Sequence, residues 1–450
     1  MTSGSGSTRA VSYPLYTMGD LASGIYSVTP SILLMFYMTN VLGVSVALAT
    51  IAAVVPKVVD LLSNPVIGTI SDRFRSRWGR RRPFILFAAV TIMPSFALIW
   101  MSPLAAPTAS AWFVLGTFSL CTLCFGCFVI PFYALSAEIA TDYHDRTSLN
   151  SIRAVYAMIG CLIAGAGAPF IVAQAGGGRH GYTVLGLVMG AIMAVAVLVT
   201  FLNAREPARA VAETVPSLRQ TLSALTGNRP FFILLTAYFI HIVASGVTGA
   251  ALAYFVTYVL GRNTNFISLL FLLSFGATIL AIPFWTMLGR RIGKFNTFAI
   301  ALLVQAVCGA CYFGLGGATS MILVAIVAIA AGMAEGGIQV FAFSMMADCI
   351  QHQSTREGAV PAEALFSGLF IAGEKLGFAA GALLGGIVFS LSGLIATTEG
   401  EIAQPASAVL GVRLAASLIP AAVNLVSVGL FCFYRSFERE VAQVSQANAA

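Results

Sequence analysis

The feature that most constrains this chain is a series of long apolar segments that recurs along almost its whole length. Each segment is long enough to cross about 30 Å of hydrocarbon as an α-helix. Hydrophobic residues make up 58% of the chain and charged residues only 9%, and no water-soluble core needs so much apolar surface. We therefore expect an all-α membrane protein with twelve transmembrane helices, at residues 15–42, 45–70, 84–105, 111–137, 150–174, 181–203, 230–260, 266–288, 296–316, 320–347, 364–394 and 410–434.

The longest polar stretch divides these spans into two sets of six. Residues 204–229 are rich in Arg, Glu and Pro, which predicts a cytoplasmic linker. The expected domains are an N-terminal half at 1–203, the linker, and a C-terminal half with a short cytoplasmic tail at 230–450. Residues 1–13 lack the apolar run of a cleavable signal peptide, so we expect the first span to stay in the protein.

The distribution of Lys and Arg predicts the orientation. With an even number of spans both termini share a side, and nineteen of the 24 cations fall on that side. The opposite loops hold Arg179, Arg262 and Arg413, and Lys57 and Lys375 lie within spans. Positive residues gather on the cytoplasmic side of a membrane, so both termini are expected in the cytoplasm. Loop anchoring also accounts for the net charge of +7, so no nucleic-acid partner is expected.

Two motifs of the first half are echoed in the second. NPVIGTISDRFRSRWGRRRPFILF at 64–87 is echoed by IPFWTMLGRRIGKFNTF at 282–298, an offset of 218 residues. ALSAEIATDYHDRTS at 134–148 is echoed by SMMADCIQHQSTREG at 344–358, an offset of 210 residues. Such a repeat predicts two pseudo-symmetric six-helix halves related by an axis along the membrane normal. That architecture is typical of alternating-access carriers.

Charged residues inside the spans need a partner or a polar cavity, because a charge at the bilayer centre costs about 2.5–3.5 kcal/mol on insertion scales. Here they are Asp20, Lys57, Asp60, Glu335, Glu374 and Lys375. Lys57 and Asp60 lie one helical turn apart, so they can neutralise each other as a structural pair or take part in transport. Lys375 either faces the central cavity or bonds Asp20, Asp60 or a nearby carbonyl.

Helices 7, 10 and 11 carry further titratable groups. Glu335 lies among glycines in AAGMAEGGIQV, and it is either a proton site or an interhelical hydrogen-bond donor. Glu374 is a second candidate proton site. His241 is interpreted as a packed, hydrogen-bonded ring in preference to a proton relay.

Cysteines and regularly spaced glycines are interpreted as packing residues. Cys121, Cys124 and Cys127 lie along a drifting helical stripe and cannot converge on one metal ion. Glycines at every fourth position across 377–385 predict tight helix packing, or a smooth surface between moving halves. No nucleophile elbow, phosphate loop or metal-ligand cluster stands in a credible setting, so no enzyme activity, cofactor or metal is expected.

Three segments carry a resemblance to a known family. VDLLSNP at 59–65, followed by DRFRSRWGRRRPFIL at 72–86, resembles the helix 2–3 signature of the glycoside–pentoside–hexuronide:cation symporters, the melibiose-permease-like branch of the major facilitator superfamily. IPFYALSAEIATDYHDRTSLNSIR at 130–153 resembles the helix 4–5 segment of that family. TREG at 355–358 with EKLG at 374–377 resembles its helix 10–11 segment. The resemblance extends over most of the chain and implies the major facilitator fold.

The resemblance implies a substrate site of Asp20, Tyr133, Arg153 and Lys375 around a central cavity. Asp20 matches a helix-1 carboxylate that hydrogen-bonds sugar hydroxyls, and Tyr133 matches an aromatic residue that stacks on the sugar. Arg153 and Lys375 match cationic residues near the cavity. The family's helix-4 carboxylate aligns with Val129, so the paired-acid clamp on the sugar is incomplete.

The resemblance also implies a cation-coupling group. Asp60 matches the first helix-2 aspartate implicated in cation coordination, whereas the second is replaced by Asn64. An amide keeps one oxygen but removes the charge that offsets the dehydration of sodium, so we expect a proton in preference to sodium. Lys57 completes the expected group, and its pairing with Asp60 would instead leave an uncoupled facilitator.

A cytoplasmic gate is expected where the basic helix 2–3 loop meets the helix 4–5 loop. Charge-assisted hydrogen bonds between the two loops would close the cytoplasmic side. The expected members are Asp72, Arg73, Arg77, Arg81, Glu138, Asp142 and Arg146.

The expected function is secondary active transport by alternating access, as a proton-coupled symporter of a sugar, glycoside or uronide in the bacterial inner membrane. The missing second carboxylate, with Arg153 and Lys375 retained, leaves open a carrier or exporter of an anionic or amphipathic molecule. A non-transporting membrane receptor is a third alternative. The expected partners are the small-molecule substrate, a proton or other monovalent cation and the lipid bilayer, and we expect a monomer.

Overall fold

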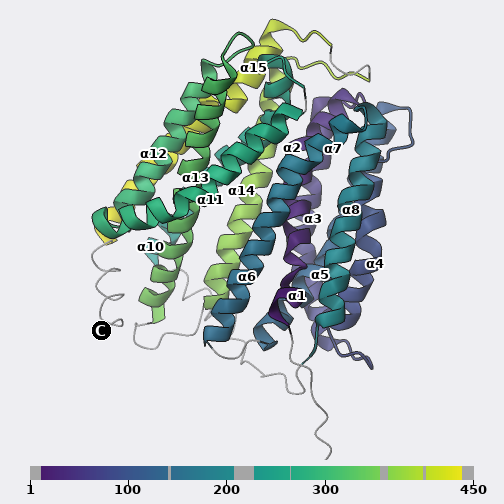
Figure 1. Cartoon of the computed structure of the whole chain (residues 1–450), viewed down its shortest axis with the longest axis vertical. Helices are drawn as coiled ribbons and strands as arrows, with labels where there is room; N and C mark the ends of the chain where they lie inside the picture. The colour runs from purple at the N-terminus through teal and green to yellow at the C-terminus, as the bar shows by residue number, and fades with distance from the viewer. Residues whose placement is uncertain are drawn as a thin grey trace, which may run out of the picture.

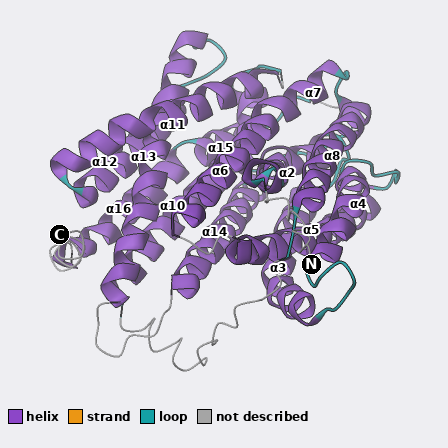
Figure 2. Cartoon of the chain, turned by 60° about the horizontal axis from the view of Figure 1, so that its bottom comes forward, coloured by secondary structure: helices purple, strands orange, loops and turns teal. Residues whose placement is uncertain are grey.

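The computed structural model describes residues 12–139, 143–206, 228–263, 265–354, 363–398 and 402–437. Across this part of the chain the structure consists of helices joined by short loops, with no strand (Figure 2). Twelve helical segments are long and apolar enough to cross a membrane, which confirms the expected number and the all-α class. Helices suit a lipid environment because they satisfy their own backbone hydrogen bonds where no water can do so.

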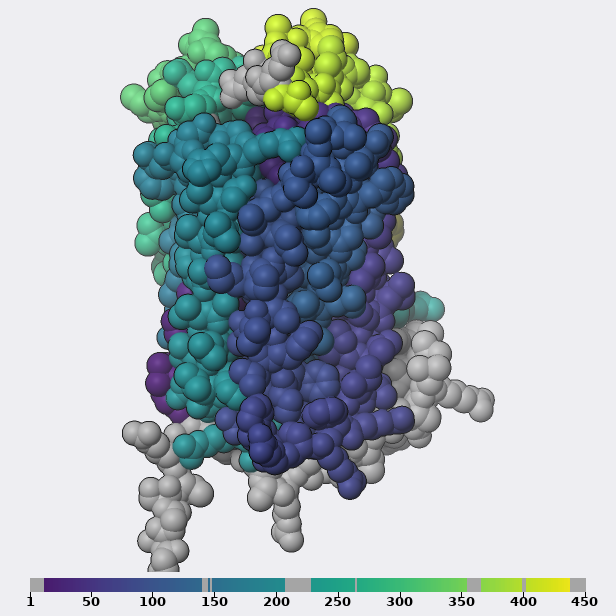
Figure 3. Space-filling model, turned by 90° about the vertical axis from the view of Figure 1, so that its right-hand side faces the viewer, coloured from purple at the N-terminus to yellow at the C-terminus, as the bar shows by residue number. Residues whose placement is uncertain are grey.

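The helices form two groups, which lie beside each other in Figure 1. The N-terminal bundle contains α1 (Tyr13–Thr17), α2 (Asp20–Asn40), α3 (Val46–Arg73), α4 (Arg82–Ile99), α5 (Pro107–Ile139), α6 (Tyr143–Leu162), the π-helix η1 (Ile163–Gly167), α7 (Ala168–Gln174) and α8 (Gly178–Asn203). The C-terminal bundle contains α10 (Arg229–Tyr254), the π-helix η2 (Phe255–Val259), α11 (Asn265–Ile292), α12 (Lys294–Phe313), α13 (Met321–Ser354), α14 (Glu363–Leu391), α15 (Ala406–Ala416), α16 (Leu418–Phe431) and the short helix η3 (Cys432–Tyr434). Figure 3 looks onto the N-terminal bundle, whose purple to teal atoms cover most of this face of the molecule. The greater part of the expected linker, residues 207–227, lies outside the described residues.

Several spans are longer than their apolar segments predict. α3 continues to Arg73 and not only to residue 70, α11 continues to Ile292, and the tenth span continues to Gln353. α3 has 28 residues and is therefore about 42 Å long, more than the thickness of the hydrocarbon. Its last charged residues consequently lie in the interface, where water is present. The third span ends earlier than expected, at Ile99, shortly before Pro103, which cannot continue a helix.

Glycines bring one pair of helices into backbone contact in each bundle. A Cβ on Gly24 would lie 2.3 Å from the carbonyl oxygen of Ala157, and a Cβ on Gly381 would lie 2.3 Å from that of Val243. Both distances are far below an ordinary contact, so only glycine lets α2 pack on α6 and α14 pack on α10 this closely. The stripe at 377–385 faces α10 throughout, which confirms its interpretation as tight packing inside one bundle. It does not form a surface between the two halves.

The two bundles meet at the end of the molecule away from the described chain ends. There the hydroxyls of Thr39 and Tyr254 are 2.6 Å apart, and Asn40 Nδ2 donates to Tyr258 OH at 2.7 Å. The backbone N–H of Thr397 donates to the carbonyl of Thr39 at 2.8 Å. These bonds join the ends of α2 and α10 and the loop after α14, so this end of the bundle interface is closed.

Candidate functional site

Three of the four residues expected to bind substrate form one cluster in the N-terminal bundle. Arg153 Nε donates to Asp20 Oδ2 at 2.7 Å, and the Tyr133 hydroxyl donates to Asp20 Oδ1 at 3.4 Å. The Arg153 guanidinium lies 4.1 Å from the centroid of the Tyr133 ring. The cluster thus joins α2, α5 and α6, and Arg153 belongs to the fifth span and not to the loop cations with which it was counted.

A break in the first span positions Asp20. α1 ends at Thr17, and Asp20 lies in the first turn of α2, where the positive end of the helix dipole favours a carboxylate. Between them, the backbone N–H of Gly19 donates to Thr200 Oγ1 at 2.8 Å. A Cβ on Gly19 would lie 2.5 Å from the Phe128 ring, so this close approach requires glycine. The break therefore depends on a residue that the sequence alone did not single out.

The cluster keeps binding capacity that the protein itself does not use. Arg153 Nη1 donates to Asn150 Oδ1 at 3.2 Å, whereas Arg153 Nη2 donates to none of the described residues. Tyr133 is 39% exposed although it lies within α5, the fourth membrane span. An exposed aromatic face beside a free guanidinium edge can stack on a sugar ring and bind a hydroxyl or a carboxylate.

Lys375 lies outside this cluster. Its ammonium donates to Asp60 Oδ2 at 2.5 Å, which joins the middle of α14 to the middle of α3 across the two bundles. Of the alternatives for Lys375, the structure therefore favours the bond to Asp60. Lys57 forms no ion pair with Asp60 and instead lies 5.8 Å from the centroid of the Phe378 ring.

Two oxygens beside this ion pair have no partner. Asp60 Oδ1 and Asn64 Oδ1 are buried, and neither accepts a hydrogen bond from any described residue. They lie one helical turn apart on α3. A buried acceptor without a donor is costly, so these oxygens mark a place where a cation, a proton or water completes the coordination.

The residues expected to form the gate separate into two sets. Arg81 lies 3.0 Å from both Asp72 Oδ1 and Glu138 Oε1, and it is buried, which is unusual for an arginine at a helix end. Arg73 and Arg77 are exposed and form no ion pair within the described chain. The network joins α3, α4 and α5 inside one bundle, so its role as a gate stays a prediction. Asp142 and the side chain of Arg146 lie outside the part that the structure describes.

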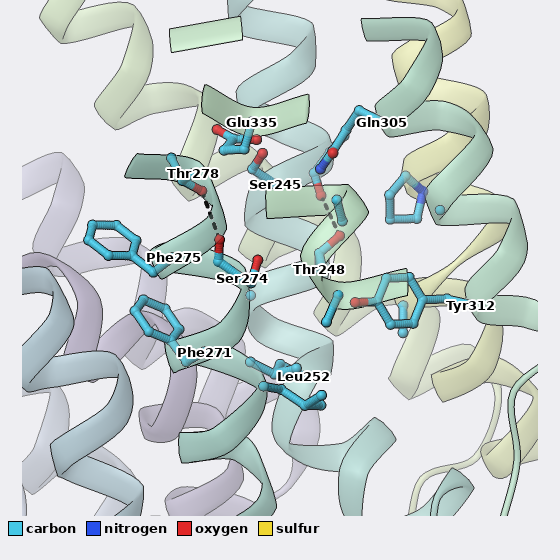
Figure 4. A pocket seen from close by; sticks show the side chains of 18 of the residues that line it. Ser245, Thr248, Leu252, Phe271, Ser274, Phe275, Thr278, Gln305, Tyr312 and Glu335 are labelled. Carbon is cyan, nitrogen blue, oxygen red and sulfur yellow. Dashed lines mark hydrogen bonds between the residues drawn. The ribbon is translucent and has the colours of Figure 1, made fainter. Parts of the chain in front are cut away.

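A second polar group surrounds a cavity of about 270 Å³ in the C-terminal bundle. The wall of this cavity combines aromatic with polar side chains, among them Phe271, Phe275, Tyr312, Ser245, Thr248, Gln305 and Glu335 (Figure 4). Glu335 Oε2 lies 3.3 Å from His241 Nε2. Glu374 makes no hydrogen bond within the described residues, but it lies in electrostatic range of Glu335. Of the two candidate proton sites, only Glu335 thus has a polar partner at contact distance.

Two residues that were not predicted from the sequence organise these sites. Glu206 accepts hydrogen bonds from the backbone N–H groups of residues 80–82 at 2.7, 2.6 and 3.0 Å, which binds the helix 2–3 loop to the end of α8. Its carboxylate also fills the space where Gly79 lacks a side chain. Asn424 Oδ1 lies 2.9 Å from His241 Nδ1. Two features of the sequence could have indicated these residues. Asn424 is a lone Asn inside an apolar helix, and Glu206 follows directly after the last span of the first half.

Comparisons with known proteins agree with this architecture. The family profile described as MFS/sugar transport protein matches residues 15–436. A glucuronide carrier protein homolog of Escherichia coli (strain K12) is 26% identical over 441 residues, which cover 95% of this chain and 93% of the relative. An isoprimeverose transporter of Lactiplantibacillus pentosus is 25% identical over 400 residues, which cover 88% of this chain and 82% of the relative.

A solved structure supports the fold. A bacterial homolog of the human lysosomal transporter Spinster, in an inward-facing and unoccupied conformation, matches with a TM-score of 0.71 over 97% of this chain and 99% of that chain, at 14% identity. The resemblance to the melibiose-permease-like branch is also confirmed, because curated relatives include carriers and symporters of glycosides. The chain belongs to the MFS/sugar transport protein family, and it is an integral membrane transporter and not an enzyme.

Proposed function

We propose that this protein is a proton-coupled symporter that takes up a sugar carrying a carboxylate, a uronide or its glycoside, by alternating access between the N-terminal half (1–203) and the C-terminal half (230–450). The observation that carries the proposal is the Asp20–Arg153–Tyr133 cluster with its free guanidinium edge. Asp20 accepts hydrogen bonds from sugar hydroxyls, and Tyr133 offers its ring face to the apolar face of the sugar. Arg153 Nη2 remains available to the substrate carboxylate.

The choice of a sugar acid follows from the charges of the cluster. Asp20 binds the Nε side of the Arg153 guanidinium. The carboxylate of a sugar acid could therefore bind the opposite edge of the guanidinium through the N–H donors that Asp20 does not use. The aligned position of the family's second acid is Val129, which is buried and apolar, so no second carboxylate repels an anionic sugar here. The name of the glucuronide carrier homolog is consistent with a sugar acid, whereas isoprimeverose, named for the second relative, is a neutral sugar.

The ion pair between the bundles supports coupling to a proton. Lys375 already neutralises Asp60, so a sodium ion at Oδ2 would have to compete with an ammonium group. A proton on Asp60 removes the charge that holds Lys375 and loosens the contact between α3 and α14. Binding of one proton thereby favours separation of the two bundles at this point, which links the ion to the conformational change.

Sodium is the second candidate, because of the two unpartnered oxygens. Asp60 Oδ1 and Asn64 Oδ1 lie on adjacent turns, and a monovalent cation could take both as ligands without displacing Lys375 from Oδ2. The two ions are separated by imposing either a pH gradient or a sodium gradient on proteoliposomes. Accumulation driven by pH and indifferent to sodium supports the proton, and accumulation only with a sodium gradient supports sodium.

The substrate class is tested by counterflow in proteoliposomes with matched labelled sugars. Phenyl glucuronide and phenyl glucoside differ only in the carboxylate, and we expect exchange of the glucuronide to be the faster. Arg153→Gln should abolish this preference, whereas Arg413→Gln, which removes the same charge at the far end of α15, should preserve it. Equal exchange of both sugars by the unmodified protein would overturn the assignment of an acidic sugar.

A further inference from the structure

The C-terminal bundle contains a histidine–carboxylate pair that the proposed mechanism does not use. His241, on α10, is fully buried, and its two ring nitrogens face two other helices. Nδ1 lies 2.9 Å from Asn424 Oδ1 on α16, and Nε2 lies 3.3 and 3.4 Å from the two carboxylate oxygens of Glu335 on α13. Both ring nitrogens are therefore occupied by oxygen neighbours from different elements.

These contacts determine where the hydrogens lie. With the Asn424 amide oriented so that Oδ1 faces the ring, this oxygen can only accept, and Nδ1 then carries a hydrogen. A neutral ring protonated at Nδ1 has a lone pair at Nε2, and a carboxylate also presents lone pairs. Two lone pairs facing each other at 3.3 Å are unfavourable, so a proton must lie between Nε2 and Glu335. The resting pair is then an imidazolium with a carboxylate, or a neutral ring with a carboxylic acid.

Access to the pair comes from one side only. The His241 side chain is 0% exposed, whereas that of Glu335 is 23% exposed and lines the cavity in Figure 4. The Glu335 carboxylate therefore connects the buried ring to the cavity and offers a route for a proton. Ser245, one turn beyond the histidine on α10, lines the same cavity, and its hydroxyl lies 3.5 Å from Nε2. When the proton has left, this hydroxyl can turn and donate to the free nitrogen.

We propose that His241 and Glu335 hold one exchangeable proton, which gives the C-terminal bundle a proton-binding site of its own, separate from Asp60. On release, the Nε2 proton passes to a Glu335 oxygen and from there to water in the cavity. The pair changes from net zero charge to a net charge of minus one, and no other bond is made or broken. The inference deepens the proposed function and rests on it only for the use of this proton in transport.

Among the described residues around the cavity, His241 and Glu335 form the acid–base pair at contact distance, and the other charges lie further away or have partners of their own. From α14, Glu374 lies in electrostatic range of both members, and Lys375 partly balances it. α2 contributes its one charged residue, Asp20, to the Arg153 cluster, and α15 directs its one, Arg413, to the ring of Phe313.

The remaining neighbours of the ring are polar but uncharged, or lie further along their helices. α16 contributes Asn424, and α10 itself contributes the phenol of Tyr238. On α13, Asp348 is bound to Lys294 at 2.6 Å, and His352 lies in the last turn of that helix. Glu335 is consequently the carboxylate that must supply the counter-charge of the ring.

The test is nitrogen NMR of the protein in lipid with labelled histidine, since the chain has four histidines and His241→Gln assigns the signal. We expect Nδ1 to be protonated throughout, and the doubly protonated ring to persist to a pH at least about one unit higher in the unmodified protein than in Glu335→Gln. Glu374→Gln is the matched control and should move this limit less. An unchanged Nδ1 signal in Glu335→Gln shows that the ring is still held by Asn424.

The proposal is overturned if the ring titrates over the same pH range with and without the Glu335 carboxylate, or if Nδ1 is unprotonated at rest. In transport, Glu335→Gln should lose accumulation driven by a pH gradient and retain counterflow. Full accumulation by Glu335→Gln would show that the His241–Glu335 pair takes no part in coupling transport to the proton gradient. Absence of any sugar exchange by the unmodified protein would instead refute the proposed function. The proton site would still be judged separately, by the titration of His241.

Discussion

At the scale of single residues, the charges inside the membrane are arranged as partners on different helices. Asp20 pairs with Arg153, and Asp60 pairs with Lys375. An unpaired charge in a poorly hydrated site costs several kcal/mol, so each member depends on the other for its stability. Lys57 and Glu374 have no such partner among the described residues, since an aromatic ring faces Lys57 and Glu374 has only charges in electrostatic range. Removing one member of a pair should therefore lower the free energy of unfolding most where the partner left unpaired is the more deeply buried charge.

The Asp60–Lys375 pair yields an asymmetric prediction. Lys375→Ala leaves a buried carboxylate alone, whereas Asp60→Asn leaves a half-exposed ammonium, so the lysine substitution should lower the unfolding temperature more. The double variant should be more stable than the sum of the two single changes predicts, by about 1–3 kcal/mol of coupling free energy. Thermal unfolding of the purified proteins measures this cycle. Lys57→Ala combined with Asp60→Asn is the control and should be additive, and additivity in both cycles would contradict the pair.

At the scale of elements, equivalent close contacts recur in the two bundles. The contact of α2 with α6 is built around Gly24 and Gly160, and that of α10 with α14 around Gly246 and Gly381. The glycines of the two pairs are 222 and 221 residues apart, as 246 − 24 and 381 − 160 give. This agrees with the duplication that the repeated motifs predict. The contacts position both Arg153 and the helix that carries Lys375.

Packing at Gly381 can be tested with a matched control. Gly381→Ala would drive its Cβ into the backbone of α10, and we expect a loss of about 1–3 kcal/mol in the free energy of unfolding. Gly276, within α11, has no atom near its absent Cβ, and Gly276→Ala should stabilise the helix by about 0.5–1 kcal/mol. Thermal unfolding compares the two variants. An equal effect of both substitutions would mean that close approach is not the reason for the glycine.

The basic helix 2–3 loop gives a second prediction at this scale. Arg81 holds Asp72 and Glu138, whereas Arg77 lies over the ring of Trp78 in solvent. Arg81→Gln should slow counterflow about tenfold, which corresponds to about 1.4 kcal/mol, with little change in substrate affinity. Arg77→Gln should leave the rate unchanged. A large loss of affinity in Arg81→Gln would make this residue a substrate ligand and not part of a latch.

At the scale of the whole molecule, the described parts of the two bundles are joined by hydrogen bonds at one end, and at mid-height α3 contacts α14 through the Asp60–Lys375 ion pair and through Lys57 over the ring of Phe378. The closed end carries the contacts of Thr39, Asn40 and Thr397 with the opposite bundle. With both termini in the cytoplasm, as the distribution of Lys and Arg predicts, this closed end would face the outside, and we expect the arrangement to correspond to an inward-open state.

The orientation is tested with impermeant thiol reagents. A cysteine introduced at position 212 of the linker should react only after cells are permeabilised, because the linker is expected in the cytoplasm. Ala105→Cys is the control, since Ala105 is exposed in the loop between α4 and α5, which would face outside. A background variant without the exposed Cys311 and Cys432 keeps the readout specific. Labelling of the linker in intact cells would reverse the proposed orientation.

The sequence by itself determined the number of spans, the helical class and the family. These are properties of local segments, because a run of apolar residues either is or is not long enough to cross the hydrocarbon. The resemblance also identified Asp20, Tyr133 and Arg153, which the structure brings into one cluster. Each of these predictions needed only segment lengths or motifs read along the chain.

Only the tertiary structure decided which charge meets which. Lys375 had several carboxylates within reach, and its partner proved to be Asp60, 315 residues away. The proton between His241 and Glu335 depends on Asn424, a residue with no charge to attract notice in the sequence. The physical reason is that a hydrogen bond requires atoms within about 3 Å, a precision set by how glycines and breaks let the helices approach. Apolar segment lengths carry no information about that placement.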